Sequence, residues 1–100
     1  MGAEDFECRI SRQAVKDVDE AFNIAREEAL YWHGHSGYTG TIAEKTSFIM
    51  VEPDEGETAV DVIERMISDE SSEYYDKWGP ACSVYDKESD DYIFFGLASS

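Results

Sequence analysis

The residues best suited to chemistry lie in one ten-residue stretch, YWHGHSGYTG at positions 31–40. It holds three glycines, two histidines, three aromatic residues, a serine and a threonine. A loop of this composition could supply a serine nucleophile, a pair of metal ligands, or backbone amides and rings for a small anionic ligand. The spacing of these residues and the elements around them discriminate between the three chemistries.

A serine nucleophile has the least support. The segment GHSGY at 34–38 is close to the Gly-x-Ser-x-Gly nucleophile elbow, but the second glycine comes one residue early and Tyr38 takes its place. The elbow also needs a strand before the serine and a helix after it, whereas we expect a helix before Ser36 and a strand after it. The sequence therefore predicts no catalytic residue, and we expect a protein that is not an enzyme.

His33 and His35 are the only histidines, and alternate residues of an extended backbone can share a metal ion. The remaining ligands would have to come from carboxylates with no particular spacing. His33 also suits a helix C-terminus, where a cation is favourable. The segment PDEGETAVDVIE has acids and a glycine but not the order of a calcium-binding EF-hand loop. We predict no metal and no cofactor.

The glycines at 34, 37 and 40 do not match the dinucleotide or phosphate-loop patterns, and the lysine of a phosphate loop is missing. Their amides could still form an anion-binding nest, which would make a nucleotide or second-messenger binding protein an alternative function. A second reading is that they end a helix and allow close packing. Trp78, in DKWGPA at 76–81, could form the opposite wall of a pocket if the two following strands are neighbours. The candidate ligand-binding residues are His33, His35, Ser36, Tyr38, Thr39, Thr41 and Trp78.

Hydrophobic periodicity predicts the elements that hold these loops. FECRI, at residues 6–10, alternates as a half-buried strand does. A helix over about 17–33 is indicated by one apolar stripe and by a near capping box at its start. GTIAE and SFIMVE read as two short strands joined by a hairpin at Lys45-Thr46. A second helix follows with Thr58 as its cap and Asp61 at its third position, because its apolar residues recur at helical spacing.

The second helix weakens at SDESSE and could resume through Tyr74, Tyr75 and Trp78. ACSVY and YIFFGLA then read as strands, and the last is apolar on both faces, which places it in the middle of the sheet. We therefore predict a single α+β domain over residues 1–100. The element order is β-α-β-β-α-β-β, with an antiparallel or mixed sheet of about five strands and two helices on one face. Cys8 and Cys82 are expected to act as small buried hydrophobes, and a disulfide between them is left open.

Net charge is the strongest global signal. The chain has 23 acidic and 8 basic residues, a formal net charge of −15, and residues 52–100 hold 14 of the acids and 3 of the bases. Such a surface repels nucleic acid and anionic membranes. We expect it to bind a basic protein surface, for example a nuclease, and a homodimer is left open. The alternative is adaptation to high salt, without a ligand. The predicted interaction face consists of Asp54, Glu55, Glu57, Asp61, Glu64, Asp69, Glu70 and Glu73.

The sequence has neither an apolar run of membrane-spanning length nor an N-terminal apolar segment typical of a signal peptide. We therefore expect a cytoplasmic protein.

The stretches GHSGYTGTIAEK, DKWGPA and FFGLAS together cover about a quarter of the chain. In them the chain resembles small uncharacterised acidic proteins encoded by bacteriophages. The resemblance implies a viral protein in the host cytoplasm that inhibits host defence, as anti-CRISPR proteins do. Some such proteins mimic DNA against restriction or CRISPR nucleases, and others bind a defence enzyme or sequester its nucleotide signal.

Overall fold

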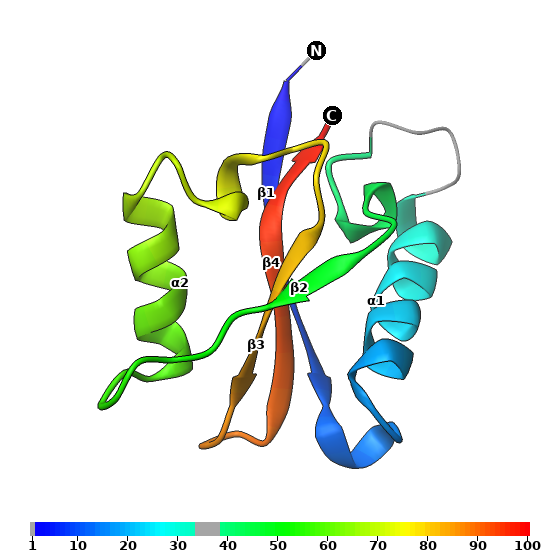
Figure 1. The fold of residues 1–100 in the computed structure, drawn as a ribbon. Helices are drawn as coiled ribbons and strands as arrows, with labels where there is room; N and C mark the ends of the chain where they lie inside the picture. Colours follow the sequence, from blue (N-terminus) through cyan, green and yellow to red (C-terminus); the bar gives the residue numbers. More distant parts are fainter. Residues whose placement is uncertain (1, 34–38) are drawn as a thin grey trace.

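The computed structural model describes residues 2–33 and 39–100. In these ranges the chain forms a four-stranded mixed sheet and two α-helices (Figure 1). The strands are β1 (Ala3–Ser11), β2 (Phe48–Met50), β3 (Ala81–Asp86) and β4 (Asp91–Ser99), in the order β1-β4-β3-β2. The helices are α1 (Val18–His33) and α2 (Ala59–Ser68), with single 3-10 turns η1 (Arg12–Ala14), η2 (Ile42–Glu44) and η3 (Glu73–Tyr75). The predicted α+β class is confirmed.

Strand β4 lies in the middle of the sheet, as its apolar run predicts. It pairs antiparallel with β1 on one side and with β3 on the other, and β3 pairs parallel with β2. Successive side chains of a strand point to opposite faces, so Phe94 faces one layer while Ile93 and Phe95 face the other. All three are at most 1% exposed. A strand buried on both faces is apolar throughout, which explains the pattern of YIFFGLA.

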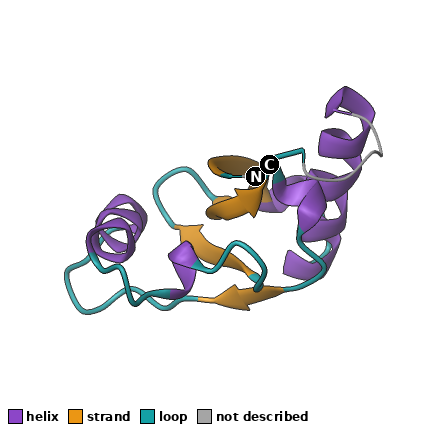
Figure 2. Cartoon of the chain, turned by 90° about the horizontal axis from the view of Figure 1, so that it is seen from above, coloured by secondary structure: helices purple, strands orange, loops and turns teal. Residues whose placement is uncertain are grey.

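The two helices cover opposite faces of the sheet, and the prediction that both lie on one face is wrong. Figure 2 shows α1 and α2 on either side of the strands. Helix α2 packs on Cys82, Val84, Ile93 and Phe95, whereas α1 packs on Ala81 and Phe94. The reason is the path of the chain. The first connection crosses the sheet from β1 to β2 and the second returns from β2 to β3, so two crossovers of the same hand place their helices on opposite faces.

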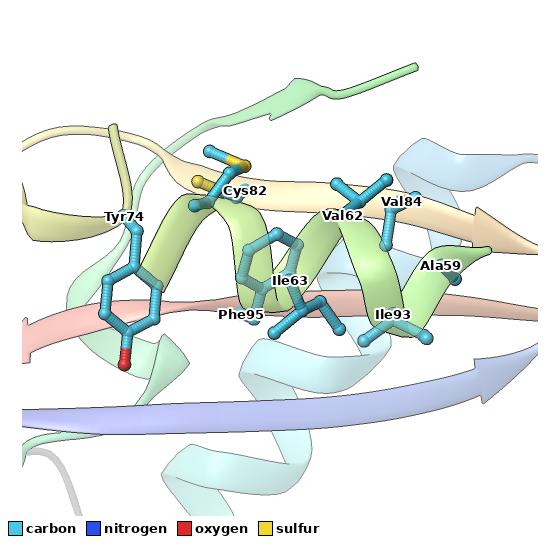
Figure 3. Packing of buried hydrophobic residues seen from close by; sticks show 9 residues of the cluster. Ala59, Val62, Ile63, Tyr74, Cys82, Val84, Ile93 and Phe95 are labelled. Carbon is cyan, nitrogen blue, oxygen red and sulfur yellow. The ribbon is translucent and has the colours of Figure 1, made fainter. Parts of the chain in front are cut away.

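Helix α2 begins where the sequence predicts. The Thr58 side chain accepts a hydrogen bond from the Asp61 amide at 3.2 Å, and the Asp61 carboxylate accepts one from the Thr58 amide at 2.9 Å. This reciprocal capping box satisfies two amides that the first turn would otherwise leave unpaired. The buried stripe of Ala59, Val62, Ile63 and Met66 then packs on β3 and β4 (Figure 3).

Helix α1 is held by a cluster of aromatic rings on the other face. The Phe22 ring lies 4.9 Å from the Phe48 ring and 5.6 Å from the Phe94 ring, measured between centroids. Ala21 and Ala25, which are 0% and 3% exposed, let the helix approach the sheet closely. This cluster joins α1 to the edge strand β2 and the central strand β4.

Two predicted elements are absent from the described residues. The segment GTIAE is not a strand, because Ile42–Glu44 form one 3-10 turn whose cap, Thr41, accepts a hydrogen bond from the Ala43 amide. There is accordingly no hairpin at Lys45-Thr46, and the sheet has four strands instead of five. After α2 only the single turn Glu73–Tyr75 forms, so the helix does not resume as far as Trp78.

The two cysteines are free thiols on opposite faces of the sheet. Cys8 lies opposite Phe94 and Cys82 opposite Phe95 in the strand register, so a disulfide between them is sterically excluded. Cys82 is buried and Cys8 half-buried, which confirms their role as small hydrophobes. Burial raises the pKa of the Cys8 thiol to about 12 and that of the Cys82 thiol to about 11. Neither thiol is a ready nucleophile at neutral pH.

Neither α-helix of the described residues is long and apolar enough to cross a membrane.

Candidate functional site

The predicted loop pocket falls largely outside the part of the chain that the structure describes. His35, Ser36 and Tyr38 lie outside the described residues, and His33 is described only as the last residue of α1. Thr39, Thr41 and Trp78 can be placed. The ligand pocket therefore stays a prediction, and its three described members show what the loop is attached to.

Thr39 and Thr41 hold the 3-10 turn η2 in place. The Thr39 amide and hydroxyl donate to Glu44 Oε2 at 3.1 and 2.9 Å, and the Thr39 and Thr41 hydroxyls lie 2.8 Å apart. Gly40 between them has a positive φ of 71° and donates from its amide to the Ser99 carbonyl. A Cβ at Gly40 would lie 2.8 Å from a Glu4 carboxylate oxygen. Gly40 thus allows close packing, as the second reading of the glycines predicts.

Lys45 links this segment to the turn that carries Trp78. Its side chain is 1% exposed, and its ammonium donates to the carbonyls of Asp76, Lys77 and Gly79 at 3.0, 3.2 and 3.1 Å. Burial lowers the pKa of Lys45, because removal from water disfavours the charged form. The sequence gives no signal for a buried lysine here. Its ammonium is occupied by the fold and is not available to an anionic ligand.

The first strands that follow the two corners in the structure, β2 and β3, are parallel neighbours, but most of the first corner lies outside the described residues. The Trp78 side chain is 64% exposed, with Lys77 Nζ 5.3 Å from its ring centroid. Thr41, however, lines a groove of about 490 Å³ between β1 and α1, and Trp78 is not among the residues that line it. Among the described residues, Thr41 thus shares a groove with residues of β1 and not with Trp78.

The predicted acidic face runs from the β2–α2 connection along α2 to η3, over residues 54–73 (Figure 1). Three of its eight carboxylates serve the fold. Glu57 accepts two hydrogen bonds from the Arg65 guanidinium at 2.8 and 2.9 Å, and this pairing lowers the pKa of Glu57 to about 2. Asp61 completes the capping box, and Asp69 accepts from the amide and hydroxyl of Ser71.

The other five carboxylates are exposed and, within the described ranges, form no hydrogen bond or ion pair. They are Asp54, Glu55, Glu64, Glu70 and Glu73. Two of them, Asp54 and Glu55, border a groove of about 560 Å³ beside the β2–α2 connection. The apolar lining of this groove includes Met50, Val51, Pro53, Ala59 and Tyr85. Free carboxylates next to an apolar hollow suit a ligand that is both cationic and partly apolar, such as a lysine- or arginine-rich protein surface.

The basic residues offset this charge only in part. Lys87 lines the same groove, Arg65 on α2 is paired with Glu57, and most of the others are engaged elsewhere. Three pair with carboxylates of the fold: Arg9 with Asp86 and Asp91, Arg12 with Asp90, and Arg65 with Glu57. Three donate to backbone carbonyls, namely Arg26, Lys45 and Lys77. The Lys16 and Lys87 side chains form neither an ion pair with a carboxylate nor a hydrogen bond to a backbone carbonyl among the described residues. The surface around α2 therefore keeps a net negative charge.

A second polar cluster ties β1 to the turn between β3 and β4. Asp90 accepts hydrogen bonds from Arg12, Gln13 and the Tyr85 hydroxyl, and the Arg12 pairing in particular lowers the pKa of Asp90 to about 2. Its backbone has a φ of 58°, a conformation that aspartate tolerates better than most residues. In the sequence, only the polar segment DKESDD between the last two strands pointed to a turn here. The cluster holds the 3-10 turn η1, directly after β1, against the turn between β3 and β4.

Comparison of the chain with models of known protein families, with curated proteins and with solved structures found no match. Among the described residues, no group of three or more histidine, cysteine or acidic side chains is arranged to hold a metal ion.

Proposed function

We propose that this protein is a non-enzymatic binding protein whose carboxylate-rich surface docks on a basic surface of another protein. By occupying a surface built for phosphates, it would inhibit a nuclease or another nucleic-acid-binding protein. The observation that carries the proposal is the set of five exposed, unpaired carboxylates over residues 54–73. The chain has bases that could neutralise them, but six of the eight are engaged in other contacts.

The geometry of α2 supports a row of negative charges. The helix has ten residues, so it is about 15 Å long at 1.5 Å per residue. Its capping box and buried stripe fix it on the sheet, which lowers the entropic cost of presenting its charges. Double-stranded DNA carries one phosphate charge per roughly 1.7 Å of its axis. Of the five free carboxylates, Glu64 lies on α2 and the other four lie on its flanks. Together they would offer a coarser set of negative charges, to which a DNA-binding surface presents the complementary charge.

The resemblance to small acidic phage proteins motivates a narrower form of the proposal, in which the target is a nuclease of host defence. The binding physics is the same in both forms. Association should be fast at low salt and slow down as salt screens the charges, because the Debye length falls from about 10 Å at 0.1 M to about 3 Å at 1 M.

The test is binding to a panel of basic nucleases and DNA-binding proteins, measured by calorimetry with and without competing DNA. One double variant, Glu64→Gln with Glu70→Gln, removes two charges of the proposed face. A matched double variant, Asp19→Asn with Glu27→Gln, removes two exposed charges of α1. The first should weaken binding at least tenfold and the second less than threefold. Equal weakening by the two, or no competition with DNA, would contradict the proposal.

A further inference from the structure

Strand β1 has an open edge, since it pairs with β4 on one side only. Gly2 and Ser100 exchange two backbone hydrogen bonds, and the Arg12 amide donates to the Asp90 carbonyl. Hydrogen-bonded and non-bonded pairs alternate in an antiparallel ladder, so the even-numbered residues of β1 bond to β4. The odd-numbered residues then direct their amides and carbonyls outward: Ala3, Asp5, Glu7, Arg9 and Ser11. No other described residue forms a backbone hydrogen bond with these groups.

A groove of about 490 Å³ runs beside this edge, between β1 and α1. Its apolar lining comes from Phe6 and Cys8 of β1, Ala25 and Ala29 of α1, and Ile42. The two alanines are four residues apart, so they lie on one face of the helix, with small side chains toward the groove. Trp32 also lines the groove and is 76% exposed. An exposed tryptophan beside an apolar hollow is a typical anchor of protein interfaces.

The rim of the groove is acidic. Glu4, Asp5, Glu7 and Glu28 are among its lining residues, and all four are exposed. Arg9, the one base in β1, is already paired with Asp86 and Asp91 across the sheet. The edge therefore combines outward backbone groups, an apolar hollow and a carboxylate rim.

We propose that this edge groove binds an extended segment of the partner protein, which adds to the sheet beside β1 and alternates apolar with basic residues. The amides and carbonyls of Asp5 and Glu7 would bond to its backbone. Residues facing α1 would enter the groove against Trp32, while alternate residues, which face the other side, would meet the Asp5 and Glu7 side chains. This inference rests on the proposed function in one respect, that the partner is basic.

A second copy of the chain fits this edge poorly. Two β1 strands side by side would bring Glu4, Asp5, Glu7 and Glu28 of both copies together, and each copy has a net charge of −15. Like charges directly opposite one another on paired strands are destabilising. The charge complementarity at this edge favours a basic segment from a different protein.

The first experiment uses two fluorescein-labelled nonapeptides of the same composition with the full chain. One peptide alternates valine and lysine, and the other has its valines and lysines in separate blocks. Fluorescence polarisation should give at least tenfold tighter binding for the alternating peptide, because only this peptide places valines on one face and lysines on the other. A further pair of alternating peptides is N-methylated at alternate amides. Methylation of the amides that face β1 should abolish binding, and methylation of the amides that face away from β1 should not.

Variants of the chain locate the site. Trp32→Ala should weaken peptide binding at least tenfold, whereas Trp78→Ala should change it less than threefold. Trp78 is the matched control because it is 64% exposed and does not line the groove, whereas Tyr31 packs against the Trp32 ring and would not be a clean control. Glu7→Pro removes an outward amide that β4 does not use, and Glu7→Gln removes only the charge. The proline variant should bind at least tenfold more weakly than the glutamine variant, with circular dichroism to confirm that both fold.

The outcomes separate this inference from the proposed function. If Glu64→Gln with Glu70→Gln weakens partner binding but Trp32→Ala and Glu7→Pro do not, the edge inference is wrong and the proposed function stands. If the alternating peptide binds as predicted but no basic protein does, the proposed function fails and the edge remains a peptide site. Equal binding of the alternating and block peptides would overturn the inference. So would a dimer in sedimentation that Glu7→Pro disrupts, because a second copy would then occupy the edge.

Discussion

Replacing Lys45 with methionine should destabilise the fold, although a lysine in a turn region is usually dispensable. Lys45 is 1% exposed, and its ammonium donates hydrogen bonds to the carbonyls of Asp76, Lys77 and Gly79. Methionine has a side chain of similar length and no donor. The Lys45→Met variant therefore removes three charged hydrogen bonds while filling much of the same space.

The expected loss follows from two opposing contributions. A hydrogen bond from a charged group is worth about 1.5–3 kcal/mol, so three of them give roughly 4.5–9 kcal/mol. Keeping an ammonium out of water costs several kcal/mol, and the variant no longer bears this cost. The net loss should be about 3 kcal/mol. A domain of this size loses roughly 4–8 °C of Tm per kcal/mol, so Tm should fall by about 12–24 °C.

Urea denaturation followed by circular dichroism measures the loss, with Lys87→Met as the matched control. Lys87 is exposed and its side chain forms no hydrogen bond or ion pair with a described residue, so this variant should stay within about 0.5 kcal/mol of the parent chain. If Lys45→Met were as stable as the control, the three carbonyls would be satisfied by water and Lys45 would not hold the turn. A loss of the same size in both variants would point to the net charge instead.

Three further predictions concern the core and the surface charge. Stability should fall as pH rises from about 9 to 12, because the folded state holds the pKa of Cys8 at about 12 and that of Cys82 at about 11, against 9.0 for a free thiol. The unfolded chain then ionises first, and at pH 11 the Cys82 thiol alone should lower the free energy of unfolding by about 2 kcal/mol, a loss that Cys82→Ala should remove; an unchanged pH dependence in this variant would be incompatible with this account. Phe94→Ala should cost about 3–5 kcal/mol in urea denaturation, since Phe94 is 0% exposed and packs on the Phe22 and Phe48 rings, and a loss below 1 kcal/mol would show that the cluster does not join α1 to the sheet. Circular dichroism in 10 mM buffer should show an intact fold, because the core does not depend on screening; unfolding as salt is removed would favour the high-salt alternative.

The helices were predictable because their signals are local. The apolar stripe and the caps of each helix lie within the helix or next to it, so Thr58 and Asp61 mark the start of α2 without reference to the rest of the chain. GTIAE has the composition of a strand, but the Thr41 hydroxyl captures the Ala43 amide and turns the backbone. This competition between a side chain and the strand ladder depends on one hydrogen bond, and composition does not reveal it.

The positions of the helices and of Lys45 depend on distant parts of the chain. Which face a helix covers follows from the order of the strands, because the connection from β1 to β2 runs across the sheet and the one from β2 to β3 runs back. Strand order is a property of pairing between segments far apart in sequence. Lys45 is buried for the same reason, since its partners are more than 30 residues away. The acidic face was predictable from counts of charges, but which carboxylates stay unpaired was not.

The distribution of the few bases favours a docking surface over acidity spread for solubility. Asp86 and Asp91 are register partners on β3 and β4, so the fold forces two like charges together, and Arg9 bridges both. Arg12 likewise neutralises Asp90, which the tight turn brings against β1. Among the described residues, the three arginines that pair with carboxylates thus neutralise acids that the fold holds in place. The charge left uncompensated over residues 54–73 lies on a capped helix and its flanks, and two of its carboxylates, Asp54 and Glu55, border an apolar hollow, which suits the docking on a cationic surface that we propose.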